Sequence, residues 1–241
     1  MKYYLDSLVI EVTRRCNMAC AHCLRGEAQS IDIDTKYIDA LLDHVSGICN
    51  ITFSGGEPSL NVPAIEYMLE QCKARDIPVG SFYVVTNGKA DPTPLAIACL
   101  KWYAYCDDKE DGLCGLTMSK DMFHDYVKKD HEDLLRGLSF FNEDKFTDFN
   151  RVQIINEGRA EELGGFSKVD QASRHGDFCY DDWGDECRIE SLVYLSANGD
   201  VKTDCDVAYD NDDYTIGNLR EESLSYIFEM QKIEKEGVLP F

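Results

Sequence analysis

Cys16-Asn17-Met18-Ala19-Cys20-Ala21-His22-Cys23 places three cysteines in a C-x3-C-x2-C spacing within one short loop. Thiolates are soft ligands suited to iron–sulfur clusters, and three of them can hold three irons of a four-iron cluster. The fourth iron is then open to a small molecule. The alternative is a structural zinc site, which usually takes four protein ligands from paired C-x2-C knuckles. No matching knuckle lies nearby, and His22 would need a strained turn to join Cys23, so the spacing favours the cluster.

Two further segments each follow a predicted strand. Ile51-Thr52-Phe53 runs into Ser54-Gly55-Gly56-Glu57-Pro58, and Tyr83-Val84-Val85 runs into Thr86-Asn87-Gly88. Glycines let the backbone approach a ligand closely, and Glu57 with backbone acceptors could meet a positively charged amino group. Ordinary Gly-Gly and Asn-Gly turns are the alternative interpretation of these two segments.

Taken together, the three segments resemble the radical SAM superfamily. Its signature has the same cysteine spacing after the first barrel strand, a GGEP motif after the second and often Thr-Asn-Gly after the third. The resemblance implies that Cys16, Cys20 and Cys23 bind a catalytic 4Fe–4S cluster. It also implies that S-adenosylmethionine sits on the open iron, seated with the help of the segment from Gly55 to Glu57.

A fourth strand is predicted at Gly115-Leu116-Thr117-Met118, and polar residues follow it. Ser119, Asp121 and a nearby Phe-His pair at this place resemble many radical SAM enzymes. Because the carboxyl ends of parallel barrel strands converge on the site, Ser119 and Asp121 could reach the cofactor or the substrate. A helix cap is the alternative role for either residue. His124 is either a proton carrier or a structural histidine.

Another strand is predicted at residues 151–156, followed by Gly158-Arg159-Ala160. This segment also resembles radical SAM relatives, in which Arg159 could pair with the methionine carboxylate of the cofactor. The cofactor-binding residues that the resemblance implies are His22, Gly55, Gly56, Glu57, Asn87, Ser119, Asp121 and Arg159.

Strand and helix patterns alternate through most of the chain, which predicts an α/β fold with a parallel sheet covered by helices. Asp34, Asn61 and Asp91 are placed to begin three amphipathic helices. We count about six strand–helix units from Leu8 to Leu163. This number fits the partial (β/α)6 TIM-like barrel that the family resemblance implies, and we assign it to residues 1–166.

Residues 167–241 change character and form a predicted C-terminal extension. Ala197-Asn198-Gly199 between two apolar segments predicts a β-hairpin, and a helix is expected from Glu222 to about Glu234. Together with three cysteines this order resembles the twitch or SPASM extension of radical SAM enzymes, which holds an auxiliary cluster. The cysteines concerned are Cys179, Cys187 and Cys205.

The match to that extension is incomplete, because no cysteine follows Cys205 and Gly199 lies one residue further from it than is usual. Three interpretations stay open. The extension holds a three-cysteine cluster with an open iron, or a cluster completed by Cys106, Cys114 or Asp204, or no metal at all. In the last case the cysteines would be ordinary core residues.

The chain has 241 residues and a net charge of −21, which argues against nucleic acid or an anionic membrane as its main partner. It begins without a signal peptide and has no apolar run long enough to cross a membrane, so we expect a cytoplasmic protein. Its eleven cysteines should then be reduced.

The resemblance implies one-electron reduction by a flavodoxin- or ferredoxin-type donor, cleavage of S-adenosylmethionine and hydrogen abstraction from a substrate by a 5′-deoxyadenosyl radical. Such an enzyme is of oxidoreductase or lyase type. The SPASM-like extension and the acidic surface favour a peptide substrate, as in the maturation of ribosomally made peptides. The alternatives are a nucleotide, sugar or other small molecule as substrate, and, in another class, a non-catalytic iron–sulfur protein of sensing or assembly.

Overall fold

The computed structural model describes residues 1–109, 113–143, 154–169, 177–184 and 186–237. Its main sheet has the strand order β10-β9-β8-β1-β2-β3-β4, with β7 paired to β8. Strands β1, β2, β3 and β4 are parallel to one another, so the fold belongs to the predicted α/β class. The strands of this sheet are β1 (Lys2–Thr13), β2 (Val45–Gly55), β3 (Val79–Thr86), β4 (Gly115–Met118), β7 (Tyr180–Trp183), β8 (Glu186–Leu195), β9 (Asp200–Lys202) and β10 (Thr215–Asn218).

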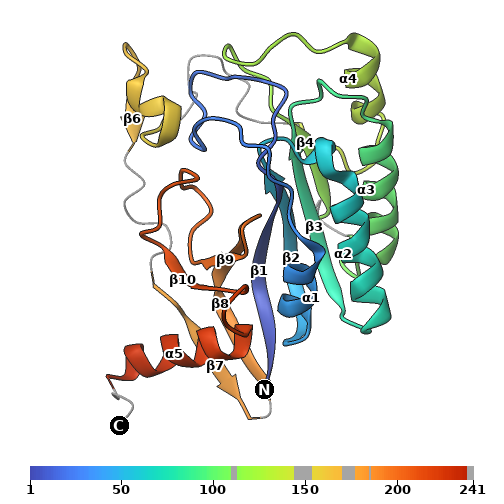
Figure 1. Ribbon diagram of the computed structural model, residues 1–241. Coiled ribbons are helices and arrows are strands. Elements are labelled where there is room, and N and C mark those ends of the chain that lie inside the picture. Colours follow the sequence, from blue (N-terminus) through green and yellow to red (C-terminus); the bar gives the residue numbers. More distant parts are fainter. Residues whose placement is uncertain (110–112, 144–153, 170–176, 185, 238–241) are drawn as a thin grey trace.

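Strand β1 is the centre of the sheet. Leu8, Ile10 and Val12 occupy alternate positions of this strand and are completely buried. Strand β1 pairs in parallel with β2 on one edge and with β8 on the other. Because β1 and β2 both end at the same edge of the sheet, the loops that follow them lie together, far from the N-terminus (Figure 1).

Three helices lie along one side of the parallel strands (Figure 1). They are α1 (Thr35–Leu42), α2 (Val62–Ala74) and α3 (Thr93–Tyr105). Asp34 caps α1 as predicted, by accepting a hydrogen bond from the backbone N–H of Lys36. Asn61 precedes α2 but makes no side-chain cap. Its Nδ2 instead donates to the carbonyl of Val12, so this residue ties the start of α2 to the end of β1.

The described part of the chain contains the first four of the about six predicted strand–helix units, from β1 to helix α4 (Lys129–Arg136). Residues 151–153 of the predicted next strand lie outside the described residues. Strand β5 (Ile154–Ile155) pairs with β6 (Lys168–Val169) in a separate two-stranded sheet. Beyond β4, the described strand pairing of the main sheet is a single parallel bridge between Leu116 and Phe141, a residue that follows α4 in sequence.

The last third of the chain builds the other half of the same sheet. Strands β8 and β9 form the predicted hairpin, whose Gly199 has a positive φ of 89°. Helix α5 (Leu224–Glu236) begins after Ser223, whose hydroxyl accepts from the N–H of Tyr226. Whether a domain boundary falls at residue 166 stays a prediction, although β8 and β1 share one ladder. In the described part of the chain, no helix has both the length and the apolar character needed to span a membrane.

Candidate functional site

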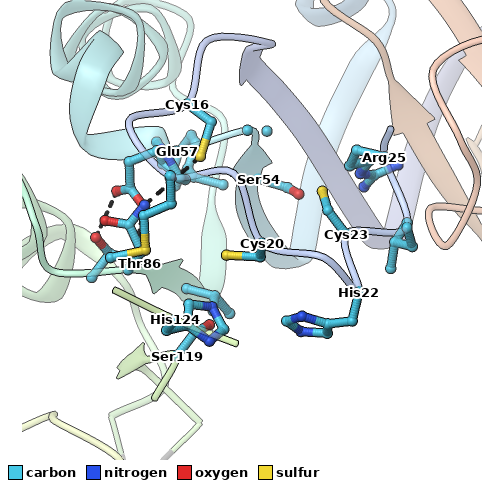
Figure 2. Close-up of a pocket in the computed structure, with 18 of the residues that line it drawn as sticks. Cys16, Cys20, His22, Cys23, Arg25, Ser54, Glu57, Thr86, Ser119 and His124 are labelled. Atoms are coloured by element: carbon cyan, nitrogen blue, oxygen red, sulfur yellow. Dashed lines mark hydrogen bonds between the residues drawn. The ribbon is translucent and has the colours of Figure 1, made fainter. Parts of the chain in front are cut away.

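A cavity of about 310 Å³ lies at the carboxyl ends of β1 to β4. Its walls come from the loop after β1, the loop after β2, the end of β3 and the loop after β4, so segments distant in sequence meet here (Figure 2). Most of the predicted site residues line it. These are Cys16, Cys20, His22, Cys23, Gly55, Gly56, Glu57, Asn87, Ser119 and Arg159.

The three cysteines of the first loop are half-buried free thiols that line this cavity. Burial, together with the neighbouring Cys23 and Cys16, raises the pKa of Cys20 to about 11, which reflects how near the three sulfurs lie. Asn87 Nδ2 is 3.8 Å from Cys16 Sγ, within reach of a weak hydrogen bond. The loop thus presents three soft donors to one space, which fits an iron–sulfur cluster.

Gly55 and Gly56 are required for the contact between the ends of β1 and β2. A Cβ on Gly55 would lie 2.2 Å from the carbonyl oxygen of Thr13, and one on Gly56 would lie 2.4 Å from that of Arg15. Gly55 also has a positive φ of 149°. Gly56 N–H donates to Thr13 O at 2.8 Å. The glycines therefore fix the second loop directly against the start of the cysteine loop.

The carboxylate of Glu57 is buried and both of its oxygens accept hydrogen bonds from the protein. Oε1 accepts from the N–H of Ser59 at 3.0 Å and from the hydroxyl of Thr86 at 2.6 Å. Oε2 accepts from the N–H of Asn87 at 2.7 Å. Glu57 thus joins the end of β3 to the loop after β2.

Two polar atoms on the cavity wall have no hydrogen-bond partner among the described residues. They are Nδ1 of His22 and Nε of Arg159, and both are buried. The backbone N–H of Arg159 donates to the carbonyl of Cys23, which holds this residue beside the cysteine loop. Because buried polar groups are normally paired, these atoms are suited to receive a polar ligand.

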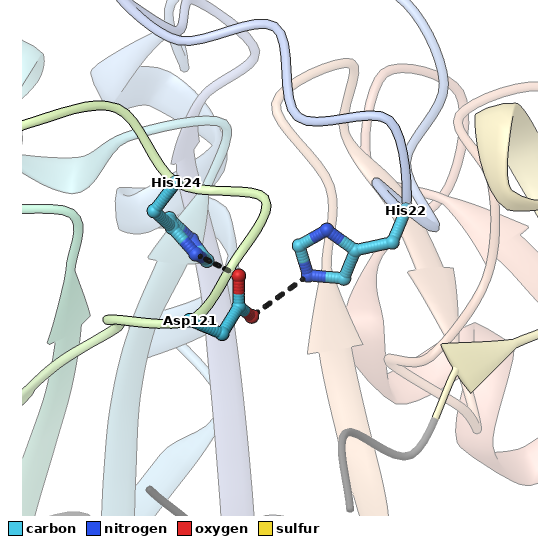
Figure 3. A group of neighbouring side chains, drawn as sticks. All are labelled: His22, Asp121 and His124. Atoms are coloured by element: carbon cyan, nitrogen blue, oxygen red, sulfur yellow. Dashed lines mark hydrogen bonds and ion pairs between the residues drawn. The ribbon is translucent and has the colours of Figure 1, made fainter. Parts of the chain in front are cut away.

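Asp121 does not line this cavity. Its carboxylate lies between the rings of His22 and His124 (Figure 3). Oδ1 also accepts from the N–H of Phe123, in a tight turn rather than at a helix start. Burial acts to raise the pKa of Asp121, but the hydrogen bonds from His124 and His22 outweigh it and hold the pKa well below its ordinary value.

Arg25 and Asp206 also line the cavity, and neither is among the site residues predicted from the sequence. Arg25 Nη1 donates to the carbonyl of Val207 at 2.8 Å, and its guanidinium lies over the ring of Tyr194, 5.2 Å from the centroid. These contacts bring the last third of the chain to the cavity. A signal for Arg25 was its place two residues after Cys23 in a strongly acidic chain.

A buried ion pair from β1 supports this junction. Arg14 Nε and Glu11 Oε2 are 2.9 Å apart. The same glutamate oxygen accepts from the N–H of Ala197 at 2.8 Å, and the guanidinium of Arg14 lies 4.6 Å from the ring centroid of Tyr209. The cysteine loop is therefore anchored to both halves of the sheet.

The structure does not bring the three predicted auxiliary cysteines together. Cys187 is opposite Tyr3 at the start of β1, whereas Cys205 is beside Arg25 near the end of β1. From Tyr3 to Ile10 the strand alone spans roughly 23 Å, at about 3.3 Å per residue. One cluster cannot bridge that distance, so the prediction of Cys179, Cys187 and Cys205 as one ligand set is wrong for this arrangement.

Three other residues were predicted as candidates to complete an auxiliary cluster, and the structure accounts for their positions without a metal. Cys106 and Cys114 lie at the amino ends of β3 and β4, because the N–H of Asp107 donates to the carbonyl of Val79 and Cys114 directly precedes β4. They are therefore at the opposite end of the sheet from Cys205. Asp204 Oδ1 accepts from the N–H of Asp206 in a local turn.

Comparison with known proteins finds a family match for the part of the chain that carries the cysteine loop. The family model described as "Radical SAM superfamily" matches residues 10–100. An uncharacterized protein, MJ0907, of Methanocaldococcus jannaschii is 35% identical over 71 residues, 28% of this chain and 25% of that protein. GTP 3′,8-cyclase of Chlorobaculum tepidum is 35% identical over 89 residues, 35% of this chain and 26% of that protein. Each match thus spans about a quarter of the relative.

Solved structures resemble the whole chain more broadly. The structure of native anSMEcpe with bound AdoMet and Cp18Cys peptide has a TM-score of 0.56 at 13% identity, covering 96% of this chain and 82% of that one. A histidine-tagged form of anSMEcpe with bound AdoMet has a TM-score of 0.55 at 13% identity, with 93% and 80% covered. At this identity the likeness concerns the fold, which includes the last third of the chain.

Proposed function

We propose, from the match of residues 10–100 to the radical SAM family model, that the chain is a radical SAM enzyme with a 4Fe–4S cluster on Cys16, Cys20 and Cys23. The observation that carries the proposal is the common cavity, on which three thiols and the Gly55-Gly56-Glu57 loop meet. When bound, the cluster and S-adenosylmethionine supply a 5′-deoxyadenosyl radical that removes a hydrogen atom from a substrate. The electron would come from a flavodoxin- or ferredoxin-type donor.

The residues of the cavity have separate tasks in this proposal. The backbone after β2 receives the amino group of S-adenosylmethionine, and Glu57 holds that backbone in place through its three hydrogen bonds. The unpartnered Nε of Arg159 is available to the methionine carboxylate. Asn87, Ser119 and the ring of His22 also line the cavity and would limit the access of water.

For the substrate we propose a peptide, modified in the manner of ribosomally made peptides. Two observations support this choice. The net charge of −21 suits a basic peptide, and a solved structure with the same fold carries a bound peptide. The sequence likeness to GTP 3′,8-cyclase favours a nucleotide as the second candidate. Dependence of S-adenosylmethionine cleavage on a basic peptide, compared with dependence on GTP, separates the two.

The test of the proposal uses anaerobically reconstituted protein reduced with dithionite. We expect Cys16→Ala, Cys20→Ala and Cys23→Ala each to abolish 5′-deoxyadenosine formation and to reduce the iron content sharply. Cys49→Ala is the matched control, because Cys49 is an exposed thiol outside the cavity. Persistence of 5′-deoxyadenosine in a signature-cysteine variant would refute the mechanism.

Electron paramagnetic resonance distinguishes the enzyme from a non-catalytic iron–sulfur protein. We expect the signal of the reduced cluster to shift when S-adenosylmethionine is added, because the cofactor binds the open iron. A spectrum that does not change, together with no binding of the cofactor, would favour a protein of sensing or assembly.

A further inference from the structure

Three side chains from two loops converge beside the cysteine cavity. His22 lies in the loop after β1, whereas Asp121 and His124 lie in the loop after β4 (Figure 3). His22 Nε2 is 3.3 Å from Asp121 Oδ2, and His124 Nδ1 is 2.7 Å from Asp121 Oδ1. One ligand atom from each residue can be chosen so that all lie within 4.8 Å of one another.

These residues form the donor set of a small divalent cation. Two imidazoles and one carboxylate on one side of an ion are typical ligands of Zn²⁺, Fe²⁺ and Co²⁺, and they leave positions open for water or a substrate. We propose that His22, Asp121 and His124 bind one divalent transition-metal ion, separate from the iron–sulfur cluster. The proposal needs only these three side chains and does not rest on the proposed function.

The surroundings are suited to an ion. The three side chains are only 13–18% exposed, so the ligands are largely ordered by their neighbours. The ring of Phe123 stacks on that of His22, with centroids 4.5 Å apart, which fixes the ring plane. Lys120, the nearest cation in sequence, is paired with Glu132 and leaves the Asp121 carboxylate to the histidines.

The open positions of the ion would face two cavities. His22 and His124 line the cysteine cavity, and Asp121 and His124 line a second cavity of about 610 Å³. An ion held here lies at the junction of the two. It would fasten the loop after β4 to the cysteine loop and place a Lewis acid at the edge of the space in which the substrate is expected.

The competing explanation is that the carboxylate of Asp121 only forms hydrogen bonds with the two imidazoles and binds no metal. The two explanations differ in metal stoichiometry, which is directly measurable. Because Cys16, Cys20 and Cys23 would also bind metal, the experiment uses the full chain with these three cysteines replaced by serine. Co²⁺ is the probe, since nitrogen and oxygen ligands give visible d–d bands, whereas thiolates add an intense sulfur-to-cobalt charge-transfer band.

We expect one Co²⁺ per chain with d–d bands and without the charge-transfer band. Asp121→Asn and His124→Ala, each added to this background, should weaken binding at least about tenfold. His131→Ala is the control, because His131 lies in the same part of the chain but hydrogen-bonds the carbonyl of Gly88. Circular dichroism of each variant verifies that it is folded.

The cluster-loaded wild-type protein provides a second readout. After exposure to Zn²⁺ and extensive dialysis, we expect mass spectrometry to find one zinc per chain in the wild type and much less in Asp121→Asn. Absence of Co²⁺ binding by folded protein would overturn the proposal. So would binding that is equal in the parent and in both ligand variants, or binding that shows only the thiolate band.

Discussion

Replacing Glu57 by glutamine tests whether its carboxylate is a structural clamp. The carboxylate accepts three hydrogen bonds in a buried position. An amide of the same shape has one accepting oxygen and one donating nitrogen. In either orientation it therefore faces at least one backbone N–H with another donor.

The expected cost follows from the lost partners. A hydrogen bond to a charged group contributes about 1.5–3 kcal/mol, and an orphaned buried donor costs about 1–3 kcal/mol. Because these terms overlap, we expect Glu57→Gln to lower the free energy of unfolding by ~2–4 kcal/mol. In a chain of this size that corresponds to a melting temperature lower by roughly 5–15 °C.

The assay is urea unfolding of the cluster-free protein, followed by the fluorescence of the fully buried Trp102. The m-value should stay the same, so that the midpoint alone reports stability. The control is Glu66→Gln, where an exposed ion pair with Lys101 is lost and a change below about 0.5 kcal/mol is expected. If Glu57→Gln lowered the free energy of unfolding by less than about 1 kcal/mol, the proposed structural role of this carboxylate would be refuted.

Three further predictions concern other parts of the chain. Gly55→Ala and Gly56→Ala should each unfold at lower temperature and bind S-adenosylmethionine more weakly, because a Cβ would lie 2.2 or 2.4 Å from a carbonyl oxygen. Gly164→Ala is the control, because a Cβ there would meet open space, and its melting temperature should match that of the wild type. Equal melting temperatures for all three variants would contradict the argument. Burial raises the pKa of Cys72 and of Cys99 to about 12, against about 8.5 in the unfolded chain; their contribution to stability is thus complete below pH 8.5 and is lost as pH rises toward 12, by up to roughly 2.7 kcal/mol per thiol at pH 10.5. Urea unfolding under reducing conditions should show a shallower alkaline loss in the Cys72→Val/Cys99→Val variant, and an unchanged slope would count against it. Cys187→Ala and Cys205→Ala should leave iron near four per chain, since the two thiols lie at opposite ends of β1; a clear fall in iron in both variants would restore an auxiliary cluster.

Local patterns in the sequence were sufficient for the parts of the site that lie within one segment. The cysteine spacing predicted a loop that follows the first strand, and the structure has this loop after β1, whose Leu8, Ile10 and Val12 are completely buried. The helix cap at Asp34 was predicted correctly because it depends on a local contact, with the backbone N–H of Lys36 two positions away. Asn61 is also a common type of capping residue, but its amide nitrogen donates to the distant carbonyl of Val12 and its side chain makes no cap.

The pairing of distant segments could not be predicted in the same way. No local signal specifies that β8 lies beside β1, since a parallel pair has no connecting turn to fix its register. For the same reason, the contact of Arg25 with Val207 and the separation of Cys187 from Cys205 became visible only in the fold. Asp121 was predicted as a ligand of the cofactor, but its position is set by two histidines, one of them from another loop.

The position of β8 beside β1 has a consequence for synthesis on the ribosome. Strand β1 leaves the exit tunnel well before β8, so one of its two edges finds its partner only after residues 186–195 have been translated. Contacts between segments distant in sequence form slowly, and an unpaired edge of a hydrophobic strand favours aggregation in the meantime. We therefore expect nascent chains that stall before residue 186 to depend on chaperones, and the cysteine loop to reach its final surroundings only after β8 has been translated.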